Sequence, residues 1–252
     1  MAYRYLLAAL LYGGWLRLRI PYFRTRFGRS WLSLSSLISL VILGGVYGQI
    51  TRVQDWRSYA VYLALGLICW NLLAGTIGSS SELLQRIRSQ LLNQELPVGF
   101  YVLENWITQV LVFLQSSLAV AGLIVLAQPQ LILHGLFGGW LGILNLWLGA
   151  LWLSLLVAPI ALRLPDLVPL IPLGLQLAFL GSPILYFSSS LGRFSWLVQF
   201  NPLYLWVKLA RDPWLGLMRW DLQLSVFTVQ ILLVILLIPW LDRQRLQLVE
   251  SL

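Results

Sequence analysis

Few side chains in this 252-residue chain have the types and spacing that catalysis requires. The single cysteine, Cys69, lies inside an apolar run, which excludes a disulfide framework and a thiolate metal site. The single histidine, His134, has no second histidine or carboxylate at ligand spacing, and we interpret it as an interfacial side chain. The only lysine, Lys208, lies between Val207 and Leu209, so the chain has no P-loop for ATP.

The nine acidic residues all fall near the ends of apolar runs or in the connections between them. Intramembrane serine or aspartyl catalysis would need a buried carboxylate or base, and none is expected here. The sequence therefore predicts no enzyme, no cofactor and no metal site. A membrane-embedded glycan-modifying enzyme and a non-transporting anchoring subunit remain alternatives from other functional classes.

The polar residues inside the apolar runs are uncharged, and hydrogen bonds between helices explain most of them. Trp70, Trp106 and Trp147 lie deeper than an interfacial belt, so core packing and stacking against a sugar both explain them. Amides and aromatic faces without charges suit a long hydroxylated chain better than an ion. The residues predicted to line a substrate path are Trp70, Asn71, Trp106, Trp147, Gln176 and Tyr186.

The composition is that of an integral membrane protein. Hydrophobic residues make up 59% of the chain and charged residues 10%, against about a quarter in soluble domains. The net charge of +8 comes mostly from arginines that flank apolar runs, which favours anionic lipid headgroups over nucleic acid as partner.

The apolar runs predict an all-α membrane protein with six transmembrane helices. These spans are residues 32–50, 58–78, 101–127, 131–162, 167–187 and 222–240. The fifth span contains three prolines and two glycines, so it should be bent or locally unwound where neighbouring protein or a wet cavity satisfies its backbone. We divide the chain into residues 1–31, an interface helix and basic arm, and residues 32–252, the six-span domain.

The first 16 residues are apolar but too short to cross a hydrocarbon core of roughly 30 Å, and they predict an amphipathic helix in the interface. A secretory signal is the alternative, but a basic cluster follows at once. With six spans, 11 of the 17 Lys and Arg residues lie on the side of both termini. The positive-inside rule places that side, including residues 79–97, in the cytoplasm.

Residues 79–97 predict a short amphipathic helix. Ser79 and Glu82 fit a capping box, Glu82 and Arg86 are spaced for an ion pair, and Pro97 cannot continue the helix. Its apolar side is formed by Leu83, Leu84, Ile87, Leu91, Leu92 and Leu96. A solvated loop and a docking helix for a soluble partner both fit this pattern.

Residues 201–221 predict two short helices before the last span. Asn201-Pro202 and Asp212-Pro213 each place an N-cap residue before a proline at the first helical position, and Asp221 can cap the last span. These helices either re-enter the outer face of the membrane or rest on it. The residues expected at this outer gate are Asn201, Pro202, Trp206, Lys208, Arg211 and Asp212.

Three stretches, read together and in order, resemble the transmembrane subunits of ABC-2 type exporters, especially those that move O-antigen, capsular polysaccharide or teichoic acid. Tyr22 to Trp31 looks like the family's basic arm, with Arg24, Gly28 and Trp31 entering the first span. Residues 66–97 are similar to its second span and coupling segment, and residues 176–212 to its fifth span and outer helices. A phenylalanine precedes Gly28 where the family commonly has leucine.

The resemblance implies a homodimer in the cytoplasmic membrane whose two copies form a channel. Each copy would dock a separate cytosolic ABC ATPase subunit through the coupling helix, residues 79–97. The coupling residues would be Glu82, Arg86, Arg88, Glu95 and Pro97. The substrate would be a polysaccharide or an undecaprenyl-linked glycan, with a lipid or drug-like molecule as the alternative.

Overall fold

The computed structural model describes residues 2–19, 30–93, 96–187 and 201–250, and every regular element in these ranges is helical. The all-α prediction is therefore confirmed for the described part of the chain. The α-helices are α1 (Ala2–Arg19), α2 (Ser30–Ile50), α3 (Trp56–Arg86), α4 (Arg88–Asn93), α5 (Val98–Ala127), α6 (Leu131–His134), α7 (Trp140–Arg163), α8 (Leu167–Leu180), α10 (Pro202–Arg211), α11 (Trp220–Arg243) and α12 (Arg245–Glu250). A π-helical turn, η2 (Gly135–Gly139), joins α6 to α7, and a 3-10 turn, η4 (Asp212–Leu215), follows α10.

Four of the described segments are long and apolar enough to cross a membrane. They are α3, α5, the continuous segment Leu131–Arg163 and α11. Helix α2 contains a shorter apolar stretch, Leu34–Ile50, and α8 has 14 residues. At about 1.5 Å per residue, α8 reaches roughly 21 Å and cannot cross a core of roughly 30 Å by itself. Length and composition thus support four of the six predicted spans, and the other two stay a prediction.

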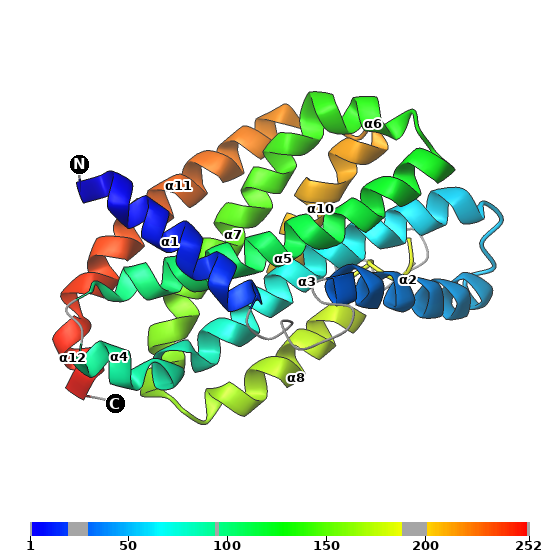
Figure 1. Cartoon of the computed structure of the whole chain (residues 1–252). Coiled ribbons are helices and arrows are strands. Elements are labelled where there is room, and N and C mark those ends of the chain that lie inside the picture. Colours follow the sequence, from blue (N-terminus) through cyan, green and yellow to red (C-terminus); the bar gives the residue numbers. More distant parts are fainter. Residues whose placement is uncertain (1, 20–29, 94–95, 188–200, 251–252) are drawn as a thin grey trace.

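Helix α3 is the centre of the bundle (Figure 1). It packs against α2, α5, α7, α8 and α10, and its residues from Tyr59 to Leu73 form much of the main hydrophobic core. Helix α11 has only three buried residues and lies at the periphery. The burial of α3 explains why it reads as apolar on all sides in the sequence.

The bundle has two distinct ends (Figure 1). Helices α4 and α12 lie at one end, while α6 lies at the other, where the turn η4 packs against α6 and α10. The α4 end contains a second hydrophobic cluster, in which side chains of α3, α4, α5, α7, α11 and α12 meet. We call these the α4 end and the α10 end.

The predicted helix start at Ser79 is wrong. Helix α3 runs without a break from Trp56 to Arg86, so Ser79 lies in its interior, and its hydroxyl donates to the carbonyl of Thr76. The break comes at Ile87, whose φ of −97° and ψ of 16° end α3 before α4 begins at Arg88. The Ser79-Glu82 capping box is therefore absent. Inside a helix, the backbone amides near Ser79 already donate to carbonyls of the preceding turn, so none is left for a side chain to cap.

The structure has a helix at the first of the two predicted positions and only a short turn at the second. Helix α10 begins after Asn201, whose side chain accepts hydrogen bonds from the amides of Leu203 and Tyr204. The segment after Asp212 is a single 3-10 turn that ends at Gly216, where φ is +81°. A left-handed residue stops a helix, and glycine adopts that conformation at low cost.

The predicted cap of the last span is also different. Arg219 occupies the N-cap position of α11 and makes no side-chain cap hydrogen bond. Asp221 lies in the first turn, where its carboxylate is 3.5 Å from Arg219. A carboxylate there still interacts favourably with the helix dipole.

The predicted unwinding of the fifth span is confirmed. Helix α8 ends at Leu180, and the chain continues to Phe187 without helical structure. Neighbouring side chains satisfy the freed carbonyls: Tyr59 donates to Leu185 O at 2.7 Å, and Tyr62 donates to Pro183 O at 2.6 Å. Protein groups replace the missing helical bonds, as a membrane environment requires.

Candidate coupling surface and outer-end cluster

The two arginines of the predicted coupling segment are exposed on either side of the α3–α4 break. Arg86 is the last residue of α3 and Arg88 the first of α4, and Glu82 is exposed one turn earlier. Arg86 donates to the carbonyl of Ser79 at 3.1 Å instead of pairing with Glu82. The predicted Glu82–Arg86 ion pair does not form, and the carboxylate and both guanidinium groups face outward.

The opposite side of this break is buried in the second hydrophobic cluster. Leu83, Leu84, Ile87 and Leu91 are each less than 5% exposed. The same cluster includes Leu248 of α12, so the segment is fixed to the C-terminal helix as well as to the bundle. The amphipathic pattern was correctly predicted except at Leu92, which is 54% exposed.

The rest of the predicted coupling segment leads into α5. Pro97 is exposed and occupies the N-cap position of α5, where it cannot offer a side-chain hydrogen bond. Asp242 of α11 substitutes for the cap, since its carboxylate accepts from the Gly99 amide at 2.9 Å. Carboxylates at a helix N-terminus are stabilising. Glu95 lies outside the described residues.

A hydrogen-bonded cluster joins α3, α5 and α7 next to the coupling segment. Asn105 of α5 donates to the hydroxyls of Ser79 at 2.9 Å and Ser80 at 3.3 Å. Ser80 also shares a 2.5 Å hydrogen bond with Ser154 of α7, and Gln109 donates to Ser79 at 3.3 Å. Interhelical hydrogen bonds of this kind hold transmembrane helices together.

Glu104 is an acidic residue within a span, and the sequence analysis missed it. It lies about two turns inside α5, and its carboxylate is 2.7 Å from the guanidinium of Arg17 in α1. Gly13 and Gly14 of α1 lie against Glu104 and Ile107, close enough that a Cβ at Gly14 would be 2.7 Å from Ile107. An available signal was the Gly-Gly pair in an apolar helix that carries a basic residue one turn later.

Arg211 is the centre of a polar cluster at the α10 end. Its side chain is 2% exposed, and its guanidinium donates to Pro183 O at 3.1 Å and to the Tyr204 hydroxyl at 2.9 Å. The guanidinium carbon lies 3.8 Å above the ring centroid of Tyr62, a cation–π contact. Arg211 therefore joins the unwound segment after α8 to α3 and α10.

Asp212 and Asn201 complete this cluster at the two ends of α10. The Asp212 carboxylate is 3.8 Å from Arg211 Nε. Burial raises the pKa of Asp212 above its ordinary value, although Arg211 and Lys208 act in the opposite direction. Asn201 donates to Ala178 O at 3.0 Å and Ser182 Oγ at 2.6 Å, which fixes the end of α8.

The other residues predicted at the outer gate differ in burial. Trp206 is buried between α10 and α7, where its ring stacks edge to face with Trp152 at 5.6 Å. Pro202 and Lys208 are exposed. The structure thus brings Asn201, Arg211 and Asp212 together and leaves Lys208 on the surface.

The residues predicted for the substrate path do not form one surface within the single chain. Trp70 is buried and packs on Phe179, with ring centroids 5.5 Å apart. Trp106 donates to the backbone carbonyl of Trp147 at 2.9 Å, so these two side chains pack within the bundle. The other three residues lie on or near α3 and α8; Asn71 and Gln176 are exposed, and Tyr186 is half-buried.

A second buried amide cluster lies between α7 and α11. Asn145 donates to the side-chain oxygen of Gln223 at 2.7 Å and accepts from Gln230 at 3.3 Å. Gln223 donates in turn to Leu209 O of α10 at 2.7 Å. Interhelical bonding was expected for most polar residues inside the apolar runs, Asn145 among them, but its partners in α11 were not identified. Glutamines seven residues apart recur on one helix face, which is a usable signal.

The interface arm lies mostly outside the described residues. This applies to Arg24 and Gly28. Trp31 is part of α2, but the position of its side chain is not described. Helix α1 runs from Ala2 to Arg19 and packs along α5, and its place in the membrane interface stays a prediction.

This chain has a distant relative among known proteins. No protein-family model matches the chain. The chain is similar to the O-antigen export system permease protein RfbA of Klebsiella pneumoniae, with 25% identity over 189 residues, which cover 74% of this chain and 72% of the relative. By its name, that relative is the permease protein of an export system. Together with the four long apolar helices, this similarity supports a multi-pass membrane protein related to an export permease.

Proposed function

We propose that this chain is the transmembrane subunit of an ATP-driven exporter that moves a polysaccharide or a lipid-linked glycan across the cytoplasmic membrane. Two copies form the channel, and each docks a separate cytosolic ABC ATPase subunit. Both termini and the α4 end face the cytoplasm. The named O-antigen permease and the resemblance of three sequence stretches to ABC-2 type exporters support this assignment.

One observation carries the proposal: the α3–α4 break presents charges outward and is fixed to the bundle on its inner side. Arg86 and Arg88 are exposed, whereas Leu83, Leu84 and Leu91 are buried in the second hydrophobic cluster. A partner that binds the arginines would therefore displace a segment whose inner side packs in one cluster with side chains of four other helices, α5, α7, α11 and α12. Arginines at such a surface suit carboxylates on a soluble partner.

The exposed amides of α3 and α8 support a channel between two copies. Asn71 lies near the middle of α3, and Gln176 lies within α8, which packs against α3. Both side chains are exposed in the single chain. Polar side chains inside a membrane seldom face lipid, so this face should adjoin a second copy or a wet path. Hydroxyl-rich glycans are suitable ligands for such amides.

The docking claim is tested by reversing charge at the break. In a strain that produces the chain together with the ATPase it is proposed to dock, we expect Arg86→Glu/Arg88→Glu to reduce co-purified ATPase and exported glycan at least fivefold. The matched control is Arg57→Glu, an exposed arginine at the other end of the same helix. Normal co-purification and export by the double variant would refute docking at this surface.

A further inference from the structure

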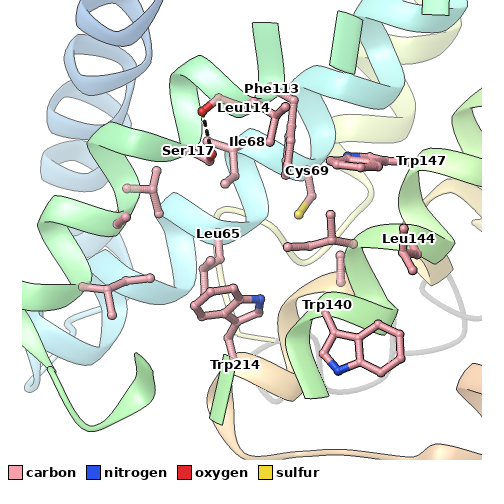
Figure 2. Close-up of a pocket in the computed structure, with 15 residues that line it drawn as sticks. Leu65, Ile68, Cys69, Phe113, Leu114, Ser117, Trp140, Leu144, Trp147 and Trp214 are labelled. Carbon is pink, nitrogen blue, oxygen red and sulfur yellow. Dashed lines mark hydrogen bonds between the residues drawn. The ribbon is translucent and has the colours of Figure 1, made fainter. Parts of the chain in front are cut away.

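A cavity of about 410 Å³ lies between α3, α5 and α7 towards the α10 end of the bundle (Figure 2). Its volume is within the range of roughly 300–1,000 Å³ found for small-molecule sites. Ala210 and Trp214 close it at the α10 end, and Cys69 and Trp147 lie at its deeper end. It is separate from the arginines of the coupling surface and from the exposed amides of α3 and α8.

The lining of this cavity is chemically suited to hydrocarbon. Among its 15 lining residues none is charged, and the polar groups are the Ser117 hydroxyl, the Cys69 thiol and the N–H groups of three indoles. The Ser117 hydroxyl is already used, because it donates to Leu114 O at 2.7 Å. A glycan would lose its hydrogen bonds with water here and gain almost none, so the site does not suit the proposed cargo.

The mouth of the cavity opens sideways between α5 and α7. Leu114, Ala121 and Trp140 are exposed at its rim, whereas Ile68 and Ile124 are buried in its wall. The rim residues belong to segments long and apolar enough to cross a membrane. The mouth therefore adjoins the acyl region of the bilayer, not the aqueous phase at either end.

The depth of the cavity fits one leaflet. Its lining runs from Trp140 to Trp147 along α7, about 10 Å, and from Phe113 to Ile124 along α5, about 16 Å. These lengths are about a third to a half of a hydrocarbon core of roughly 30 Å. The cavity can take part of one chain that enters from the side of the α10 end.

We propose that this cavity binds a fatty acyl chain of a bilayer phospholipid from the leaflet at the α10 end. Apolar cavities of this kind exclude water and bind apolar molecules. Phospholipid acyl chains are the bulk hydrocarbon at the mouth, so they occupy the site by mass action. The proposal rests on the chain spanning a membrane and does not depend on export. Because Ala210 and Trp214 contact the chain, the bound lipid also supports α10.

The test is photolabelling in lipid nanodiscs. The full chain is reconstituted in phosphatidylethanolamine and phosphatidylglycerol that contain a trace of phosphatidylcholine with a diazirine near the middle of one acyl chain. We expect mass spectrometry to place adducts on Ile68, Phe113 or Leu144, with at least fivefold enrichment over Val229 and Leu232, which are exposed on α11. Equal labelling of both sets would overturn the proposal.

A pair of variants on α5 provides the matched control. Ala121→Phe places a ring in the mouth, so cavity labelling should fall at least fivefold. Leu118→Phe, at an exposed residue outside the lining, should leave labelling unchanged. Two results would refute the proposal. Protection of the cavity from labelling by an isoprenoid phosphate, at a substoichiometric ratio to phospholipid, would make the isoprenoid the occupant. Disulfide crosslinking of two copies through Ala121→Cys would mean that a second copy covers the mouth.

Discussion

At the scale of single residues, the same side chain has different consequences according to its surroundings. Asn71 and Asn145 both lie within apolar helices, but Asn71 is exposed, whereas Asn145 is buried and bonded to Gln223 and Gln230. The sequence alone does not separate the two, because both asparagines lie inside long apolar runs. The structure makes one a candidate for contact with substrate and the other a structural residue.

The two asparagines should therefore respond differently to leucine. Asn71→Leu should leave the melting temperature within about 2 °C of the wild type, since surface changes seldom exceed about 0.5 kcal/mol, and it should reduce glycan export. Asn145→Leu should destabilise the protein by about 1–3 kcal/mol, because it leaves buried amides of α11 unpaired. Thermal unfolding in detergent and an export assay measure both. Full export by Asn71→Leu would remove this residue from the proposed path.

Arg211 and Lys208 make a second matched pair, three residues apart on α10. Arg211→Met should lower the free energy of unfolding by about 3–5 kcal/mol, since Pro183 O and the Tyr204 hydroxyl lose a buried charged donor. Lys208→Met should have an effect within about 0.5 kcal/mol, because that side chain is exposed. Arg211→Lys should also be destabilised relative to the wild type. An ammonium group cannot donate to both Pro183 O and the Tyr204 hydroxyl while lying flat on the Tyr62 ring, as the guanidinium does. Equal melting temperatures for all three variants would contradict this role.

At the scale of elements, helix contacts depend on glycines at which a side chain has no room. In α7, a Cβ at Gly142 would lie 2.2 Å from the carbonyl oxygen of Leu209 in α10, so the two helices meet at the backbone. In the π-helical turn, a Cβ at Gly135 would lie 2.2 Å from the ring of Trp214. Gly122 in α5 has nothing within 4 Å of that position.

Alanine should thus act in opposite directions at Gly142 and Gly122. Gly142→Ala should cost about 1–3 kcal/mol, because the clash is with backbone that cannot rotate away. Gly122→Ala should stabilise α5 by roughly 0.5–1 kcal/mol through helix propensity. Thermal unfolding of the two purified variants gives the comparison, and destabilisation by both would mean that propensity is not the deciding difference.

Features of an element that depend on local backbone geometry can be predicted from the sequence, whereas its partners in distant parts of the chain cannot. Among the prolines and glycines of residues 167–187, only Gly181 and Pro183 lie in the unwound stretch, whereas the other three lie within α8. Local backbone preference therefore predicted that the segment unwinds but not where. The partners of this stretch, Tyr59 and Tyr62, are more than 120 residues away in sequence, and spacing does not reveal them. Ser79 shows the reverse error: its capping pattern is locally valid, but bonds from Asn105 and Gln109 stabilise a continuous helix instead.

At the scale of the whole molecule, the two ends of the bundle are built differently. The α4 end is an apolar cluster under exposed arginines, and the α10 end is a buried cation surrounded by tyrosines and carbonyls. Composition and arginine placement predicted a helical membrane protein with a polar segment between its spans. The assignment of contacts to either end required the structure, since both ends are formed by residues far apart in sequence.

This arrangement separates docking from transmission of force. Leu91 is 2% exposed in the cluster that joins α4 to α12, and the adjacent Gln90 is exposed. Leu91→Ala should keep the arginines accessible and the ATPase co-purified, while glycan export falls at least fivefold because α4 is less firmly held by α5, α7 and α12. Gln90→Ala should change neither readout. Loss of ATPase binding in Leu91→Ala would show that the cluster serves docking itself, and unchanged export would show that force reaches the bundle by another route.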